Sequence, residues 1–377
     1  MPGRRKILSV VGTRPNFMKV APVAAALGRQ ADEFEHVLVH TGQHYDDAMS
    51  RVFLEELGVG EPDHMLHVGS SSHAQQTARV MERLEPVLLE EDPELVLVPG
   101  DVNSTMAAAL VAAKLGIALG HVEAGLRSFD RTMPEEVNRV VTDQLSSLLF
   151  THSPEAREHL LAEGREERQI HYVGNTMIDT LVAMRERVEA AGAPAAHGVE
   201  PGSYLLVTLH RPALVDGPLL ATVLRELIAL AGHMTVIFPV HPRTRAAIEA
   251  QGLASAGRLR LLEPLGYIEF LSLLTDAAGA LTDSGGIQEE TTYLGVPSFT
   301  LRDTTERPIT VESGTNTLLG LAPERIAQVP RLLALATPSA AQVPPLWDGM
   351  AAERIVDVLA EGGGSSAECY RAGARPA

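Results

Sequence analysis

Residues 95–116 have the sequence LVLVPGDVNSTMAAALVAAKLG. It passes from a short apolar run, through a polar turn, into an alanine-rich segment of helical length. A short run that is apolar throughout is typical of a strand buried on both faces of a parallel sheet, and a helix is the usual crossover to the next strand. The stretch therefore predicts one strand–turn–helix unit of parallel α/β structure.

The same alternation continues in both directions along the chain. Short apolar or β-branched runs recur between longer helical patterns. In the first half they are KILSVV, HVLVH, LVLVPG, IALGHV and LLFTH, and in the second half YLLVTLH, TVIFPVH, LRLLEP, GALTDS and PSFTL. Between the two sets, residues 188–204 (VEAAGAPAAHGVEPGSY) are rich in Ala, Gly and Pro, which predicts a linker.

The predicted fold class is therefore α/β, with two doubly wound parallel-sheet domains. A chain of 377 residues is too long for one typical core and fits two domains. We expect these domains at residues 1–180 and 200–345. In residues 346–377, LWDGMAAERIVDVLAEG has the apolar spacing of an amphipathic helix, which we expect to pack back on the N-terminal domain, and a frayed tail follows.

Composition excludes several classes of protein. The formal net charge of −17 argues against a nucleic-acid partner, which needs a basic surface. No apolar run approaches the roughly 18 residues of a spanning helix, so no membrane partner is expected. The single cysteine, Cys369, allows no internal disulfide and fits a reducing cytoplasm. Because HExxH, CxxC and GxSxG are all absent, we predict neither a metal site nor a serine-hydrolase centre.

Polar signals gather where the predicted strands end. They are GTRPNFMK, GQHYD, GDVNST and HVEAGLR in the first half, and HRP, HPRTR and DSGGIQEE in the second. Ligands of open α/β sheets bind at the carboxyl ends of strands. We therefore expect the rims of both sheets to face one central cleft.

Two of these segments suit an anion. Arg14 and Lys19 stand at a strand-to-helix turn, where a helix N-terminus adds free N–H groups. Ser284 and Gly285–Gly286 open a helix in DSGGIQEE, and the glycines let the backbone approach a diphosphate closely. Glu289 and Glu290 follow in its first turns, placed for ribose hydroxyls. The alternatives are an ordinary turn with exposed cations and a dipole-favoured helix start.

The acidic residues have competing explanations too. Asp101 lies at the tip of an apolar strand, where it either binds something or caps the following helix. Glu123 stands between a strand and a glycine with no helix to cap. Thr132 to Glu135 match a capping box, so Glu135 has a structural explanation beside a catalytic one. The valines and leucines that follow, Val137, Val140, Val141, Leu145 and Leu148, predict the buried stripe of that helix.

The ordered motifs closely resemble the non-hydrolysing UDP-N-acetylglucosamine 2-epimerases over roughly residues 6–360. The resemblance rests on GTRPNFMKVAPV, HTGQHYD, GDVNSTMA, HVEAGLRS, MPEEVNR, VGNTMID, LTDSGGIQEE, LGVPSFTLRDTTERP and DGMAAERIVDVL. It implies a glycosyltransferase-B-like fold of two Rossmann-like domains and a homodimer. It also implies interconversion of UDP-N-acetylglucosamine and UDP-N-acetylmannosamine by elimination and re-addition of UDP, with no cofactor.

The resemblance also implies roles for single residues. Asp101, Glu123 and Glu135 match the family's catalytic acids, with Lys19 and His210 beside the diphosphate and the leaving group. The residues that match its contacts to the UDP-sugar are Arg14, Arg139, Phe270, Ser284, Gly285, Gly286 and Glu290. A hydrolysing epimerase, a glycosyltransferase and a UDP-sugar-binding regulator are the alternatives, and an oxidised or further aminated UDP sugar is an alternative substrate.

One segment departs from the family pattern. Many bacterial members carry HRREN where this chain has HRPALVD, and in those members the segment belongs to a second, activating UDP-N-acetylglucosamine site. The matching residues that persist here are Gln43, Glu136, Arg211 and His241. Because the rest of the segment is altered, we expect activation to be weak or absent.

Overall fold

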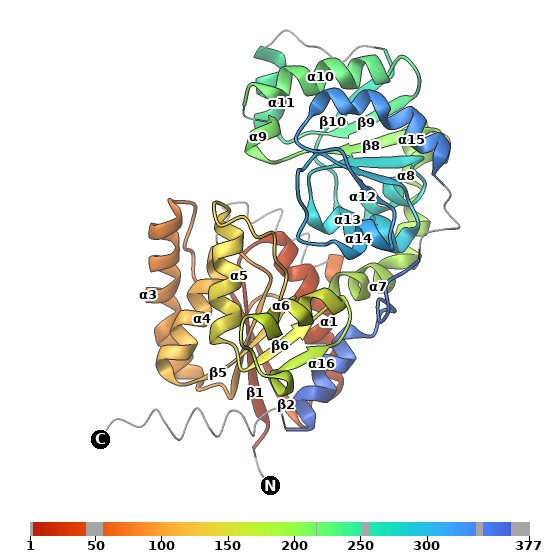
Figure 1. Cartoon of the computed structure of the whole chain (residues 1–377). Coiled ribbons are helices and arrows are strands. Elements are labelled where there is room, and N and C mark those ends of the chain that lie inside the picture. The colour runs from red at the N-terminus through yellow and green to blue at the C-terminus, as the bar shows by residue number, and fades with distance from the viewer. Residues whose placement is uncertain (1–2, 43–55, 216, 251–256, 337–341, 363–377) are drawn as a thin grey trace. The chain divides into compact units, whose positions relative to one another are not determined.

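The computed structural model describes residues 3–42, 56–215, 217–250, 257–336 and 342–362 (Figure 1). The chain divides into two compact units. Unit 1 comprises Met1–Ala183 and Pro345–Ala377, and unit 2 comprises Met184–Pro344.

Unit 1 alternates strands and helices. Its strands are β1 Arg5–Val11, β2 Phe34–His40, β3 His64–Met65, β4 Leu95–Pro99, β5 Ala118–Val122, β6 Leu148–Thr151 and β7 Ile170–Tyr172. Its helices are α1 Arg14–Arg29, α3 His73–Glu91, α4 Asn103–Leu115, α5 Pro134–Leu145, α6 Pro154–Ala162, the 3-10 turn η1 Glu167–Gln169, and α16 Ala351–Ala360. Helix α7 (Thr176–Ala191) crosses the boundary between the units.

Unit 2 repeats the alternation. Its strands are β8 Tyr204–Thr208, β9 Thr235–Pro239, β10 Leu259–Leu262, β11 Gly279–Thr282, β12 Ser298–Thr300 and β13 Asn316–Leu318. Its helices are α8 Ala193–Ala196, α9 Pro212–Val215, α10 Leu219–Leu230, α11 Pro242–Ala250, α12 Tyr267–Thr275, α13 Gly285–Leu294, α14 Ile309–Glu312, the 3-10 segment η2 Pro323–Gln328, and α15 Val329–Leu335.

Both sheets are parallel and doubly wound, as predicted. In the described part of the chain the first sheet has the strand order β3-β2-β1-β4-β5-β6-β7 and the second β10-β9-β8-β11-β12-β13. The order reverses between β1 and β4 in unit 1 and between β8 and β11 in unit 2. Loops diverge at such a reversal and leave a crevice at the carboxyl ends of the strands. Ligand sites of open α/β sheets are therefore expected at these two points.

Three strands were missed by the sequence analysis. Strands β3, β7 and β13 contain only two or three residues each, so they carry no apolar run to detect. The predicted linker at residues 188–204 was also partly wrong, because α7 continues to Ala191 and α8 follows at Ala193–Ala196. Alanine is the best helix former, so alanine-rich sequence extends the helix here.

Apolar side chains cover both faces of each sheet. In unit 1, Leu8 and Val10 pack with α3 and α4 on one face, while Ile7 packs with α1 and α16 on the other. Alternate residues of one strand are thus buried on opposite sides, which explains why the strands read as continuous apolar runs. In unit 2, α10 and α13 lie on opposite sides of the sheet (Figure 1). No helix in the described part of the chain has the length and apolar character needed to cross a membrane.

The C-terminal helix α16 is held on unit 1 by a carboxylate from α7. Asp179 Oδ1 and Oδ2 accept the backbone N–H groups of Ala351 (3.1 Å) and Ala352 (2.7 Å), which are the first residues of α16. Nearby, Trp347 Nε1 donates to the carbonyl oxygen of His152 at 2.8 Å. Asp179 therefore caps a helix that is distant in sequence.

Asp179 is expected to make stability depend on pH. Burial raises the pKa of Asp179 to about 6, against the opposing effect of the Ala352 and Ala351 N–H donors. Because the folded state holds this proton more tightly than the unfolded chain, the contribution is greatest below about pH 4 and is lost as the pH rises through about 6. Relative to Asp179→Asn, the wild type should lose up to ~3 kcal/mol of unfolding free energy between about pH 4 and about pH 7. Urea unfolding of both proteins over this range measures it, and a pH-independent difference would contradict it.

Candidate active site

A buried ion pair lies at the carboxyl ends of β1 and β5. Lys19 Nζ is 2.6 Å from Glu123 Oε2, and both side chains are almost fully buried. Glu123 has a backbone φ of +70°, a left-handed conformation that is rare for a residue with a side chain. Such strain is found mostly at functional sites, where the surroundings enforce it. The geometry therefore supports a functional role for Glu123.

The turn after β4 is shaped to admit Lys19. Gly100 has a φ of +63°, and a Cβ atom there would lie 2.8 Å from Lys19 Nζ. Asn16 Nδ2 donates to the carbonyl oxygen of Pro99 (3.1 Å), which ties α1 to the same strand end. The Gly100 N–H donates to the carbonyl oxygen of Val122 (3.0 Å). Asp101 and Glu123, which follow these two residues, are therefore neighbours.

Asp101 is paired rather than capping. Helix α4 begins at Asn103 with Val102 as its N-cap, so the capping explanation for Asp101 is wrong. Its carboxylate instead accepts a hydrogen bond from Arg139 Nη1 at 2.6 Å, and its side chain keeps 22% of its exposure. The two neighbouring carboxylates thus each contact a buried cation.

Helix α5 differs from its sequence prediction in two ways. The capping box is absent: Met133 is the N-cap, and the Thr132 hydroxyl donates to Asp130 at 2.6 Å. The predicted valine stripe is not the buried face either, since Val137 is 39% exposed and Val140 and Val141 are half-buried. The residues that α5 buries are instead polar: Glu136, Asn138, Arg139, Thr142 and Asp143.

Glu135 stands alone in unit 1. Its side chain is exposed at the start of α5, and it makes no hydrogen bond or ion pair with any residue that the structure describes. The cap assigned to Glu135 is therefore wrong, while its catalytic role stays a prediction.

A buried chain of polar residues supports both strand ends from behind. His121 Nε2 donates to the carbonyl oxygen of Gly100 (2.8 Å), and its Nδ1 lies 2.6 Å from Asp143 Oδ1. Asp143 also accepts the Gly125 N–H (3.2 Å) and pairs with Arg127 (2.7 Å). Burial alone would raise the pKa of Asp143, but His121 and Arg127 outweigh it and lower that pKa. Asp143 thus fixes the turns next to both Asp101 and Glu123.

In unit 2 a buried carboxylate orients His210 at the carboxyl ends of β8 and β11. Asp283 Oδ2 accepts the N–H groups of His210 (3.0 Å) and Arg211 (2.8 Å), and Oδ1 is 2.8 Å from His210 Nδ1. Asp283 is fully buried, while the His210 ring is 61% exposed. With Nδ1 directed at Asp283, Nε2 is the ring nitrogen left to contact a ligand. The sequence analysis missed Asp283, although it stands directly before Ser284.

The start of α13 has the predicted form. Ser284 is its N-cap and Gly285 its first residue. A Cβ atom on Gly285 would lie 2.8 Å from Arg307 Cζ, so the glycine lets a guanidinium rest against the helix N-terminus. Arg307 in turn contacts Glu289 (2.8 Å) and Glu306 (2.6 Å). Arg307, in the TTERP motif, is a second residue that the sequence analysis missed.

The other predicted contacts of unit 2 are placed as follows. Glu290 is buried and accepts a hydrogen bond from the Tyr267 hydroxyl at 2.9 Å, and Phe270 is half-buried on the same helix as Tyr267. Glu289 is buried with its Oε1 2.8 Å from Arg307 Nε, and its predicted contact to ribose stays a prediction. His241 is exposed beyond β9.

Three further residues belong to the predicted site. Arg14 is exposed at the start of α1. Arg211 Nε donates to the carbonyl oxygen of Asp283 (3.1 Å). Gln43 lies outside the described residues. Among those residues, no cluster of three His, Cys, Asp or Glu side chains is arranged to hold a metal ion.

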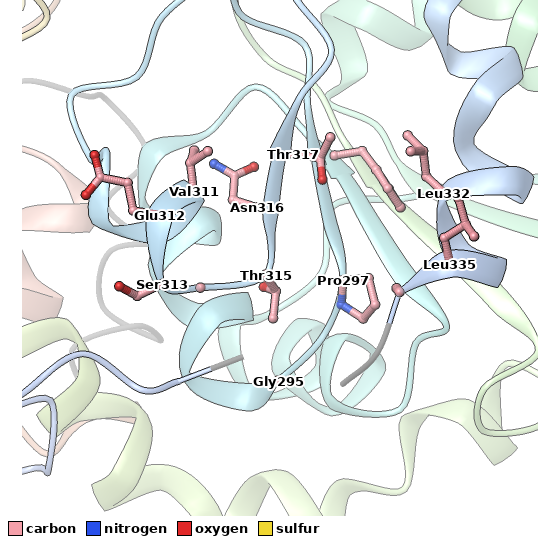
Figure 2. A pocket seen from close by; sticks show the side chains of 13 residues that line it. Gly295, Pro297, Val311, Glu312, Ser313, Thr315, Asn316, Thr317, Leu332 and Leu335 are labelled. Atoms are coloured by element: carbon pink, nitrogen blue, oxygen red, sulfur yellow. The ribbon is translucent and has the colours of Figure 1, made fainter. Parts of the chain in front are cut away.

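A pocket of about 390 Å³ lies elsewhere in unit 2 (Figure 2). Its lining comes from the residues that lead into β12 and β13, such as Pro297 and Thr315, and from Leu332 and Leu335 of α15. It is thus at the amino ends of these strands, away from the carboxyl ends where His210 and Ser284 lie.

Comparison with known proteins matches this arrangement to a family. A family model described as UDP-N-acetylglucosamine 2-epimerase matches residues 26–360. The chain belongs to this family. A UDP-N-acetylglucosamine 2-epimerase of Methanocaldococcus jannaschii is 40% identical over 95% of this chain and 99% of its own length. A UDP-2,3-diacetamido-2,3-dideoxy-D-glucuronate 2-epimerase of Pseudomonas aeruginosa is also 40% identical, over 86% of this chain and 91% of its own.

A solved structure of an epimerase of this family agrees with the fold. The crystal structure of Methanocaldococcus jannaschii UDP-GlcNAc 2-epimerase in complex with UDP-GlcNAc and UDP superimposes with a TM-score of 0.85 at 40% identity, and the match covers 95% of this chain and 100% of that one. The predicted resemblance and the predicted glycosyltransferase-B-like α/β fold are confirmed.

Proposed function

We propose that the chain is a non-hydrolysing epimerase that interconverts UDP-N-acetylglucosamine and UDP-N-acetylmannosamine. The observation that carries the proposal is the pair of neighbouring carboxylates, Glu123 and Asp101, each in contact with a buried cation. They lie at the carboxyl ends of β5 and β4, next to the sheet's switch point. Carboxylates are among the side chains that take and return protons in enzymes. Unit 2 adds an anion-binding turn at the matching point of its own sheet.

The reaction needs a proton transfer on each face of the sugar. As a carboxylate takes the C2 proton, the bond from C1 to UDP breaks, which gives a 2-acetamidoglucal and UDP. UDP then adds back to C1 while an acid returns a proton to C2 from the opposite face. Atoms and electrons balance without an oxidant, so the route requires no cofactor.

We assign the proton transfers to Glu123, Asp101 and Glu135. Glu123 is the most deeply buried of the three, and Lys19 holds its carboxylate in place. Asp101 keeps partial exposure, which leaves it accessible to a sugar. Glu135 is the third by family resemblance.

UDP must stay bound between the two half-reactions, and unit 2 offers suitable groups. The N–H groups of Gly285 and Gly286 at the start of α13 favour an anion, and Arg307 adds a cation beside them. The Ser284 N–H already donates to the Thr282 hydroxyl oxygen (2.9 Å), so Ser284 offers its hydroxyl group. His210, oriented by Asp283, stabilises the charge on the departing diphosphate. By family resemblance, Arg14, Phe270 and Glu290 complete the UDP contacts. Arg139, for which the resemblance also implies a contact to the UDP-sugar, donates to Asp101 at 2.6 Å.

The relatives support a second candidate substrate. The Pseudomonas aeruginosa protein, named for an oxidised and further aminated UDP sugar, is as similar in identity as the archaeal UDP-N-acetylglucosamine 2-epimerase. We favour UDP-N-acetylglucosamine because the archaeal match covers more of both chains. By family resemblance we further propose a cytoplasmic homodimer with weak or no activation by UDP-N-acetylglucosamine.

Hydrogen exchange at C2 tests the proposal. The protein is incubated in D2O with each of the two UDP sugars, and the products are followed by NMR. We expect deuterium at C2 and intact UDP-N-acetylmannosamine from UDP-N-acetylglucosamine. Free N-acetylmannosamine with UDP would indicate a hydrolysing epimerase instead, and turnover of the diacetamido sugar alone would select the second substrate. Absence of exchange with both sugars would exclude either epimerase activity.

A further inference from the structure

The buried polar face of α5 contains a carboxylate, Glu136, that has no role in the proposed mechanism. Glu136 is 1% exposed, although a buried charge is costly unless it is fully hydrogen-bonded. It accepts the Ser128 N–H (2.9 Å), the Ser128 hydroxyl (2.9 Å), the Phe129 N–H (3.0 Å) and Arg139 Nη2 (2.9 Å). Burial alone would raise the pKa of Glu136, but the Ser128 N–H and Arg139 outweigh it and lower that pKa.

Arg139 joins this carboxylate to the reacting one. Its Nη2 donates to Glu136 and its Nη1 donates to Asp101 at 2.6 Å. The guanidinium is itself buried, so its direction is set by the groups that it contacts. Planar geometry lets one guanidinium serve two carboxylates at fixed angles, which an ammonium group does not do. Glu136 therefore helps to fix the position of the Arg139 guanidinium, and through it the position of the Asp101 carboxylate.

Glu136 also holds the strained turn at residues 128–129 through hydrogen bonds. Phe129 has a φ of +58° and a side chain that is 72% exposed, and its N–H is held by Glu136. A bulky residue in this conformation is a clear outlier that persists only when its surroundings enforce it. One carboxylate thus holds the turn at residues 128–129 and the guanidinium on Asp101 in a single network.

Resting on the epimerase function proposed above, we propose that Glu136 is a positioning residue for Asp101, acting through Arg139, and not a ligand of an activating UDP-sugar. All four hydrogen bonds to its oxygens come from the protein. This inference replaces the effector role that the family resemblance implies at this position.

The test compares Glu136→Gln with the wild type. Glu136 accepts Arg139 on Oε2 and the Phe129 N–H on Oε1, whereas a glutamine offers an acceptor oxygen on one side and an N–H donor on the other. Either Arg139 or the turn at residues 128–129 therefore loses its acceptor, and the negative charge that holds the guanidinium is lost in both cases. Supporting groups of this kind typically change activity about 10- to 100-fold. We expect kcat for epimerisation to fall at least about tenfold, with KM for UDP-N-acetylglucosamine changed less than about threefold. A kcat within twofold of the wild type, or a loss confined to KM, would overturn the proposal.

A second variant and a double variant show whether Glu136 acts through Arg139. In Arg139→Lys the charge is kept but one ammonium group cannot hold both carboxylates, so kcat should fall similarly. The double variant should then be no slower than the slower single variant, because both changes break one linkage. Losses that multiply independently would overturn the proposal. Arg139→Lys alone still tests the linkage if Glu136→Gln does not fold.

A matched control and an effector assay complete the design. Glu94→Gln removes an arginine-paired carboxylate at the amino ends of β1 and β4, where Glu94 contacts Arg5 at 2.6 Å, and its kcat should equal that of the wild type. Initial rates from UDP-N-acetylmannosamine are measured with and without added UDP-N-acetylglucosamine. A Glu136→Gln enzyme with a normal basal rate that loses only activation would make Glu136 an effector ligand and overturn the proposal. No C2 exchange in the wild type itself would overturn the epimerase function first.

Discussion

Glu123→Gln is expected to lower kcat for C2 epimerisation by about 10³-fold, within the range that a general acid or base contributes. Glutamine has nearly the same shape as glutamate and tolerates the same backbone, but it cannot take a proton. Its amide also leaves Lys19 as a buried cation without its 2.6 Å partner. Breaking one side of a buried ion pair typically costs about 3–5 kcal/mol, so stability should fall as well. Initial rates of UDP-N-acetylmannosamine formation and a thermal melt measure the two effects.

A double variant separates chemistry from stability. Adding Lys19→Met to Glu123→Gln removes the unpaired cation, so the melting temperature should recover while kcat stays low. Glu91→Gln is the matched control, because Glu91 also pairs with a lysine, Lys6, at 2.8 Å, but contributes nothing to the sheet's switch point. It should keep wild-type kcat. C2 deuteration by Glu123→Gln at the wild-type rate would remove Glu123 from the mechanism.

The sequence predicted those site residues that belong to motifs at the ends of strands. Asp101 and Glu123 follow apolar strands directly, and the parallel topology then requires that they meet at one edge of the sheet. Ser284 and Gly285 likewise follow β11 and open α13. Local pattern and topology were sufficient here because the carboxyl ends of adjacent parallel strands lie together whichever side chains surround them.

The prediction failed where partners from elsewhere in the chain decide the outcome. The apolar spacing of Val137, Val140 and Val141 indicated the buried face of α5, yet the structure buries its charged residues. Those charges are tolerated because Asp143 contacts His121 and Arg127. A pattern of apolar spacing considers only the polarity of each side chain in the helix. It therefore cannot show that a buried charge is paired with a residue from another helix or strand.

The same limit explains the missed residues of unit 2. Asp283 reads as an ordinary polar residue at a strand end, and only the fold brings the backbone N–H groups of His210 and Arg211 to it. Arg307 lies in a loop well after Gly285 in sequence, and the contact between them appears only once β11 and β12 are adjacent. Asp283 and Arg307 belong to the LTDSGG and TTERP motifs, which the sequence analysis had identified. Their place in these motifs did not by itself indicate what either residue contacts.

Asp283→Asn is expected to lower kcat/KM by about 10²-fold or more, as for other groups that orient a catalytic histidine. Burial alone would raise the pKa of Asp283, but the side chain of His210 and the N–H groups of Arg211 and His210 outweigh it, so that pKa is lowered. The ionised carboxylate thus stabilises the fold above the unfolded pKa of about 4, and this contribution is lost as the pH falls. An asparagine offers one acceptor oxygen where three donors converge, and its own N–H group faces another donor. His210 then loses its orientation.

Two comparisons make this prediction specific. His210→Asn should lower kcat/KM at least as far, and combining it with Asp283→Asn should add little, because the aspartate acts through the histidine. Asp276→Asn is the matched control, since Asp276 ends α12 ahead of β11, at the opposite end of that strand. Its kcat/KM should stay within twofold of the wild type. Normal kcat/KM in Asp283→Asn, or losses that multiply in the double variant, would show that the role of His210 does not depend on the Asp283 carboxylate. The turn at the start of α13 would then have to bind UDP without a histidine oriented by Asp283.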